Sequence, residues 1–85
     1  MMGKIQQIRQ QENVLSMLPI VELTGQGRLL IENHQGVLSY APNTIKIKVS
    51  YGCVIITGNS LQLMEMSRVK LAICGRIDCL QLLGR

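Results

Sequence analysis

The sequence predicts an all-β fold of about eight short, mainly antiparallel strands in a small sandwich or barrel-like array. Two observations predict this fold. Apolar residues alternate with polar ones, most clearly in Ile45-Lys46-Ile47-Lys48-Val49, as in a strand with one buried face. Residues that favour turns also interrupt the apolar runs at short intervals. These breaks lie at 25–27, 34–36, 41–43, 51–52, 58–59, 66–68 and 75–76.

Residues 1–17 differ in composition from residues 18–85, which we expect to form a single β domain. The first segment is rich in Gln, and Ile5, Ile8 and Leu15 are spaced so that a helix would place them on one side. We therefore expect a short or partly ordered N-terminal helix that packs on the β domain through this side.

Two features of the apolar runs bear on the architecture. Leu29–Ile31 and Val54–Ile56 are continuously apolar, which is typical of strands covered on both faces. Three segments also share the pattern apolar, any residue, apolar, Thr or Cys, Gly, and they end at Gly25, Gly58 and Gly75. The glycines are 33 and 17 residues apart, so one spacing is nearly twice the other. A short β-solenoid of stacked coils is therefore an alternative.

The composition favours association with another chain. Eighty-five residues are enough for one small domain, whose own core provides limited stability. The chain is 47% apolar, with two Tyr and no Phe or Trp, and this surplus of aliphatic residues predicts a homo-oligomer or a partner surface. No apolar run is long enough to span a bilayer, and the N-terminus lacks the apolar block of a signal peptide. We expect a cytoplasmic protein with no direct membrane insertion.

Charge and cysteine content exclude further classes. The net charge of +4 comes from Lys and Arg residues that are spread along the chain, without the dense cationic patch or stacking aromatics of nucleic-acid binders. No nucleic-acid partner is expected. Cys53, Cys74 and Cys79 are odd in number and form no CxxC pair, so we expect free, buried thiols rather than disulfides or a zinc site.

His34 is the only histidine and the natural candidate for chemistry. Glu32 lies two residues earlier, on the same side of an extended strand, and a Glu/His pair can bind a metal or move a proton. A complete catalytic site needs further groups that the sequence does not provide, and no nucleophile or phosphate-binding motif is present. We favour a structural role, in which Asn33 and His34 bond to the backbone before the turn at Gly36. No catalytic residue, metal ligand or cofactor is predicted, so we expect a protein that is not an enzyme.

A second candidate site consists of four cationic residues: Lys46, Lys48, Arg68 and Lys70. If their strands are neighbours, these side chains would line one face and bind an anionic ligand, an acidic partner or an anionic membrane surface. The favoured alternative is a solvated outer face whose lysines prevent unwanted strand pairing.

Met64 and Met66 offer flexible apolar contacts. These could serve the core or a partner surface, and we favour packing in the core.

The block Ile31-Glu32-Asn33-His34, followed by Gly36, is the most distinctive motif of the chain. Leu18-Pro19 and Leu23-Thr24-Gly25 precede it, and three glycine-containing motifs follow: Gly52, then Ile56 with Gly58, then Gly75-Arg76-Ile77. In this order and spacing the chain resembles the YabP/YqfC family of bacterial sporulation proteins, most closely the YqfC branch. The resemblance extends from about Val14 to Leu82.

The resemblance implies a non-enzymatic sporulation protein. Similar proteins are made in the mother cell of endospore-forming bacteria and are associated with building the outer layers of the spore, its coat and cortex. Members of this branch are typically encoded beside a membrane-bound stage IV sporulation protein, which is the implied partner and would place the protein at the forespore membrane. No catalytic residues are established for the family. The residues of this chain that match the motifs of the family are Pro19, Gly25, Glu32, Asn33, His34, Gly36, Gly52, Gly58 and Gly75.

Overall fold

The computed structural model describes residues 18–84, which form six β-strands. Within this range no helix is long and apolar enough to cross a membrane. The expected N-terminal helix lies outside the described residues. The strands are β1 (Ile20–Thr24), β2 (Arg28–Glu32), β3 (Val37–Ala41), β4 (Thr44–Val49), β5 (Gly52–Met66) and β6 (Lys70–Gly84).

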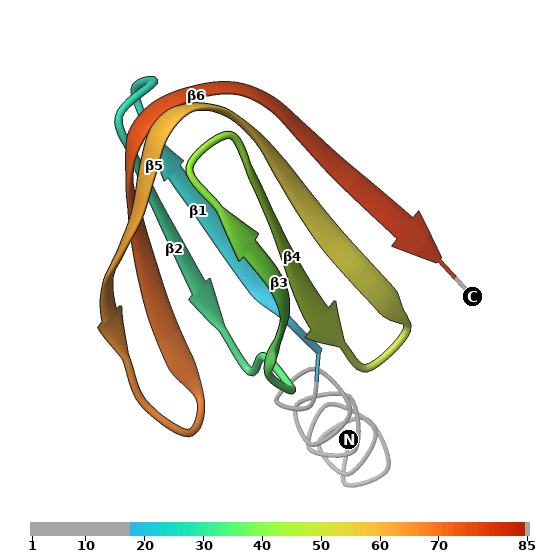
Figure 1. The fold of residues 1–85 in the computed structure, drawn as a ribbon. Helices are drawn as coiled ribbons and strands as arrows, with labels where there is room; N and C mark the ends of the chain where they lie inside the picture. Colours follow the sequence, from blue (N-terminus) through green and yellow to red (C-terminus); the bar gives the residue numbers. More distant parts are fainter. Residues whose placement is uncertain (1–17, 85) are drawn as a thin grey trace, which may run out of the picture.

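All strand pairs are antiparallel, and the order across the sheet is β1-β2-β6-β5-β4-β3. The long hairpin of β5 and β6 is central, and the short hairpins β1–β2 and β3–β4 flank it (Figure 1). The prediction of an all-β, antiparallel fold is confirmed. The β-solenoid alternative is wrong, because the coils of a solenoid stack as parallel strands.

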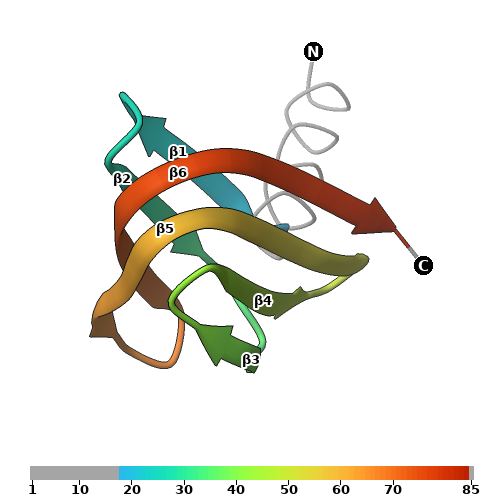
Figure 2. The same cartoon turned by 45° about the horizontal axis from the view of Figure 1, so that its top comes forward.

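The prediction of about eight strands is wrong because two expected turns lie inside strands. Residues 58–59 lie within β5 and residues 75–76 within β6, and each of these strands is 15 residues long. Both strands arch near these positions, so the sheet folds back on itself (Figures 1 and 2). The result is one open, folded sheet rather than the two separate sheets of a sandwich.

Glycines at the arch explain why the strands bend without ending. A Cβ atom at Gly58 would collide with the carbonyl oxygen of Arg76 on β6. Gly75 has a φ of +132°, and a Cβ atom there would lie 2.6 Å from the carbonyl oxygen of Ser60. The register between β5 and β6 shifts at the same place, beside Gly58, as expected for β-bulges that bend a sheet. Close backbone approach therefore requires these glycines.

The arch divides the sheet into two layers. One layer contains β1, β2, the first half of β6 and residues 59–66 of β5. The other contains β3, β4, the first half of β5 and residues 78–84 of β6. In Figure 2, β5 and β6 each run through the arch and so pass from one layer into the other.

The core between the layers is entirely aliphatic. Alternation is confirmed in β4, where Ile45, Ile47 and Val49 are buried while Lys46 and Lys48 are exposed. Burying an aliphatic side chain of this size contributes about 1.5–3 kcal/mol to the stability of the fold. The expectation that both faces of the continuous apolar runs are covered is not met, because the middle residue of each run is only half-buried. The core residues are Leu29, Ile31, Ile45, Ile47, Val49, Val54, Ile56, Leu61, Leu71, Ile73 and Ile77.

Candidate functional site

The distinctive motif of the sequence forms the crossover from β2 to β3. The Asn33 N–H donates to the carbonyl oxygen of Val69, just before β6, at 2.6 Å. Two residues later the Gln35 N–H donates to the carbonyl oxygen of Lys48 at 2.7 Å, and the Lys48 N–H donates to Gly36 at 2.8 Å. The crossover is thus bonded first to one layer and then to the other.

His34 lies at the centre of this crossover with 7% of its surface exposed. Its Nδ1 atom accepts the backbone N–H of Gly36 at 3.0 Å, and its Nε2 atom lies 2.9 Å from the carbonyl oxygen of Ser67. Because Nδ1 is the acceptor, the neutral ring must have its proton on Nε2, which donates to Ser67. Both ring nitrogens are therefore used by hydrogen bonds with the backbone.

The neighbours of His34 also have local structural roles. Asn33 has a positive φ of 64°, a conformation that Asn tolerates better than most residues, and its Nδ2 atom donates to the carbonyl oxygen of Leu18 at 2.8 Å. Gly36 has a φ of +121°, which strongly favours glycine. These two conformations turn the chain between the layers.

Glu32 does not form the Glu/His pair that the sequence suggested. It lies opposite Lys70 in the register of β2 and β6, and its Oε1 atom is 3.5 Å from the Lys70 Nζ atom. This ion pair is partly exposed, so its contribution to stability is small, about 0–1 kcal/mol. Among residues 18–84, no group of three or more His, Cys, Asp and Glu side chains is arranged to hold a metal ion.

The remaining motif residues lie at turns and at the arch. Pro19 precedes β1, and Gly25 lies in the turn between β1 and β2 with a φ of +57°. Gly52 begins β5, where a Cβ atom would collide with the backbone of β6. Gly58 and Gly75 are the glycines of the arch described above. The motif residues are therefore spread over the fold and form no single cleft.

The candidate cations come from β4, from the β5–β6 turn and from the start of β6. Lys46 and Lys48 lie together on the exposed side of β4. Arg68 lies in the turn between β5 and β6, and Lys70 begins β6. Because β5 separates β4 from β6, the strands that contain the lysines are not neighbours. Anion binding by these residues stays a prediction, and Lys46 and Lys48 are the two that lie on one strand.

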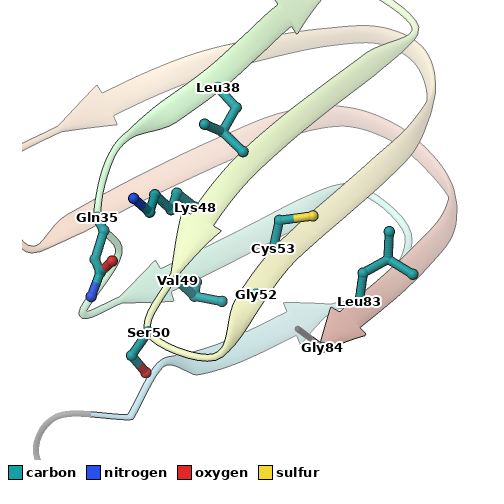
Figure 3. A pocket seen from close by; sticks show the side chains of 9 residues that line it. All are labelled: Gln35, Leu38, Lys48, Val49, Ser50, Gly52, Cys53, Leu83 and Gly84. Carbon is teal, nitrogen blue, oxygen red and sulfur yellow. The ribbon is translucent and has the colours of Figure 1, made fainter.

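An open pocket of about 700 Å³ lies beside Lys48 and was not predicted. Side chains from four strands line it, among them Leu38 of β3, Lys48 of β4, Cys53 of β5 and Leu83 of β6 (Figure 3). Sequence reasoning missed it because strand order decides which of these distant residues meet. Its lining is mostly apolar with one cation.

The sequence predicted that the cysteines, Met64 and Met66 are buried, and both predictions are wrong. All three cysteines are free thiols, as expected, but none is fully buried: Cys53 and Cys74 are half-buried and Cys79 is exposed. Met64 and Met66 are also exposed, at the end of β5, so they do not pack in the core. Cys79 and the two methionines lie where the two long strands have passed the arch and lost one neighbour.

Comparison with known proteins gives the family. The YabP family model matches residues 19–85. The chain belongs to the YabP family. It is also similar to a protein of Bacillus subtilis (strain 168) named "Uncharacterized protein YqfC", with 27% identity over 66 residues, which cover 78% of this chain and 71% of that protein. These matches confirm the YabP/YqfC resemblance. No solved structure matches the chain.

Proposed function

We propose that this YabP-family protein is a non-enzymatic structural or interaction module in endospore envelope formation, acting on coat and cortex assembly in the mother cell. The observation that carries the proposal is the family match over residues 19–85, because the YabP/YqfC resemblance implies a sporulation role. The motif residues of that resemblance have structural positions in the fold, which agrees with a role that depends on shape rather than chemistry.

The environment of His34 supports the non-enzymatic part of the proposal. A general base needs a ring nitrogen within reach of a substrate proton, whereas both nitrogens of His34 bond to backbone groups. Its nearest acidic candidate in sequence, Glu32, pairs with Lys70 instead.

Exposed aliphatic residues support the interaction part. Leu38, Met64 and Leu82 are each more than half exposed, although side chains of this kind are most often buried. The proposed partners are a second copy of the chain, the membrane-bound stage IV sporulation protein, or both. Binding to that membrane protein would place this one at the forespore membrane without insertion.

Deletion of the gene in the sporulating bacterium that encodes it tests the function. We expect fewer heat-resistant spores and an abnormal coat or cortex by electron microscopy, with both restored by the wild-type gene. Vegetative growth serves as the control and should not change. Normal numbers of heat-resistant spores with a normal envelope would contradict the proposal.

A second candidate function is binding to an anionic surface, favoured by the exposed Lys46 and Lys48 on β4, of which Lys48 lines the open pocket. Flotation with vesicles of phosphatidylglycerol and phosphatidylcholine tests it. Binding should occur at low salt, weaken as salt screens the charges, and be lost in the double variant Lys46→Gln/Lys48→Gln. The double variant Arg68→Gln/Lys70→Gln removes the same charge elsewhere and should still bind. Absence of binding at low salt, or equal loss in both variants, would remove this candidate.

A further inference from the structure

The folded sheet leaves four strand segments at an edge within residues 18–84. β1 and β3 end the strand order. Past the arch, residues 59–66 of β5 have no neighbouring β4, whose pairing with β5 stops at Thr57. Residues 78–84 of β6 likewise have no neighbouring β2, which pairs only with residues 70–74. An unprotected edge strand is a template for pairing with another chain, and proteins usually block such edges.

The edges of β1 and β3 are blocked in familiar ways. Both strands have only five residues. β1 follows Pro19 and contains the charged Glu22, while β3 has a register shift between Val37 and Ser39 and precedes Pro42. Short length, proline, charge and bulges each oppose pairing with another strand.

The edge of residues 59–66 is blocked by hydrogen bonds from the β3–β4 hairpin. The Leu61 N–H donates to the carbonyl oxygen of Pro42 at 2.7 Å. The Leu63 N–H donates to the Tyr40 hydroxyl oxygen at 3.2 Å. Two donors that would otherwise face another chain are thus satisfied within the molecule.

Residues 78–84, which we call the open edge, have a charge and a register shift only at Asp78, and among the described residues none of these protections continues from Cys79 onward. The segment contains no proline, and its only charged residue is Asp78, at its start. From Cys79 to Gly84 it is Cys-Leu-Gln-Leu-Leu-Gly, so two strands can approach along it without like charges meeting.

The alternation of backbone hydrogen bonds identifies the groups that point outward from the open edge. The Gly58 N–H of β5 donates toward the β3–β4 turn, on the β4 side. Successive N–H groups point to opposite sides of a strand, so the Ile55 N–H points to β6, where Ile55 lies opposite Gln81. Gln81 therefore directs its backbone groups to β5. The N–H and C=O groups of Leu80 and Leu82 point away from β5, toward solvent.

The side chain of Leu82 is the second sign that this edge is incomplete. Leu82 lies opposite Val54, which is fully buried, so the two side chains share the core face of the sheet. Leu82 is nevertheless 55% exposed. A further strand beside β6 would supply the apolar neighbour that this position lacks.

We propose that the open edge pairs antiparallel with the open edge of a second copy, joining two sheets into one continuous sheet about a twofold axis at Gln81. This register pairs residues 79–83 of the two copies, which follow the register shift at Asp78, and places Leu80 of each copy opposite Leu82 of the other. A strand that fits here needs apolar residues on the core face and no charge at the centre, and β6 itself meets both conditions. The inference names the partner and surface for the interaction role proposed above, and it is tested without reference to sporulation.

The first test is the solution mass by light scattering after size exclusion, across a range of concentrations and under reducing conditions because Cys79 is exposed. We expect a dimer with twice the 9.5 kDa mass of one chain. A monomer at every concentration would overturn the proposal, while leaving the sporulation role open to the deletion experiment.

Two matched variants then locate the interface. Leu82→Lys places a charge opposite Leu80 of the second copy and should weaken dimerisation at least about tenfold, a loss typical of a charge in an apolar contact. Leu38→Lys is the control, because Leu38 is similarly exposed, at 58%, but lies in the blocked strand β3. Circular dichroism verifies that both variants are folded. Equal dimerisation of the two variants would place the interface elsewhere.

A cross-link tests the register without depending on a destabilising change. In the proposed dimer the two Gln81 residues face each other as a pair without hydrogen bonds, with Cα atoms about 4.5 Å apart, which suits a disulfide. Gln81→Cys should therefore form a covalent dimer through residue 81 on mild oxidation, identified by mass spectrometry. Wild type and Gln62→Cys are the controls. A dimer that forms no link through residue 81 would overturn this register.

Discussion

Residues 59–66 of β5 and residues 78–84 of β6 are equivalent parts of one hairpin, yet their edges differ. Both segments lie past the arch and both have lost one neighbouring strand. The β5 segment has its Leu61 and Leu63 N–H groups bonded by the β3–β4 hairpin. Among the strands of residues 18–84, the β6 segment pairs only with β5.

Because of this difference, we expect the β5 segment to contribute to the stability of the fold and the β6 segment to association with a second copy. The end of the β5 segment is also fixed by His34, which bonds to Ser67 just after β5. Changes on the β5 side should therefore alter the free energy of unfolding, whereas changes on the open edge should alter the solution mass. Three substitutions outside the open edge, at Gly75, His34 and Tyr40, test whether this division holds.

The largest effect is expected for Gly75→Ala, which acts on the arch that creates both segments. The new Cβ atom would lie 2.6 Å from the Ser60 oxygen, in a backbone conformation that disfavours side chains. We expect a loss of about 3 kcal/mol or more in the free energy of unfolding, measured by urea denaturation.

Gly27→Ala is the matched control for this change. A Cβ atom at Gly27 would lie 3.8 Å from its nearest neighbour, the Gly75 oxygen, which is ordinary contact. Its effect should stay within about 1 kcal/mol. Similar stability of the two alanine variants would show that close approach at Gly75 does not hold the arch.

An intermediate effect is expected for His34→Ala. The substitution leaves the Ser67 carbonyl and the Gly36 N–H without their ring partners at a buried position. The expected loss is about 2 kcal/mol, with no change in solution mass. Gln35→Ala, an exposed neighbour, should change the unfolding midpoint little. An unchanged midpoint in His34→Ala together with weakened self-association would instead assign His34 to recognition.

The smallest effect is expected for Tyr40→Phe, which removes the hydroxyl group that accepts the Leu63 N–H. Water can replace this acceptor at an exposed site, so we expect a loss of about 0.5–1 kcal/mol by thermal or urea unfolding. Tyr51→Phe, in the β4–β5 turn, is the control. If Tyr40→Phe lowers the solution mass without altering the free energy of unfolding, the β5 side takes part in association, which would contradict the proposed difference between the two edges.

Much of the local structure could be read from the sequence. Strict alternation in residues 45–49 predicted which side chains are buried, because successive side chains of a strand point to opposite faces. The turn expected at residues 51–52 ends β4, and the motif around His34 forms the expected break after β2. The structural interpretation of Asn33 and His34 agrees with their bonds to the backbone.

The candidate sites were harder to predict, since they depend on which strands are neighbours. Lys46 and Lys70 have similar local sequences, but β5 lies between their strands. Glu32 and His34 are two residues apart, yet one faces Lys70 and the other enters the crossover. Spacing along the chain could not distinguish these environments.

The sequence by itself determined the fold class, the alternation that builds the aliphatic core and the family. Only the tertiary structure decided that Gly58 and Gly75 bend strands instead of ending them, because a glycine permits both a turn and a close backbone approach. That choice merges the predicted short strands into β5 and β6 and folds the sheet. It also decides which edges the hairpins block and which one is left for a second chain, since edge protection arises from contacts between segments distant in sequence.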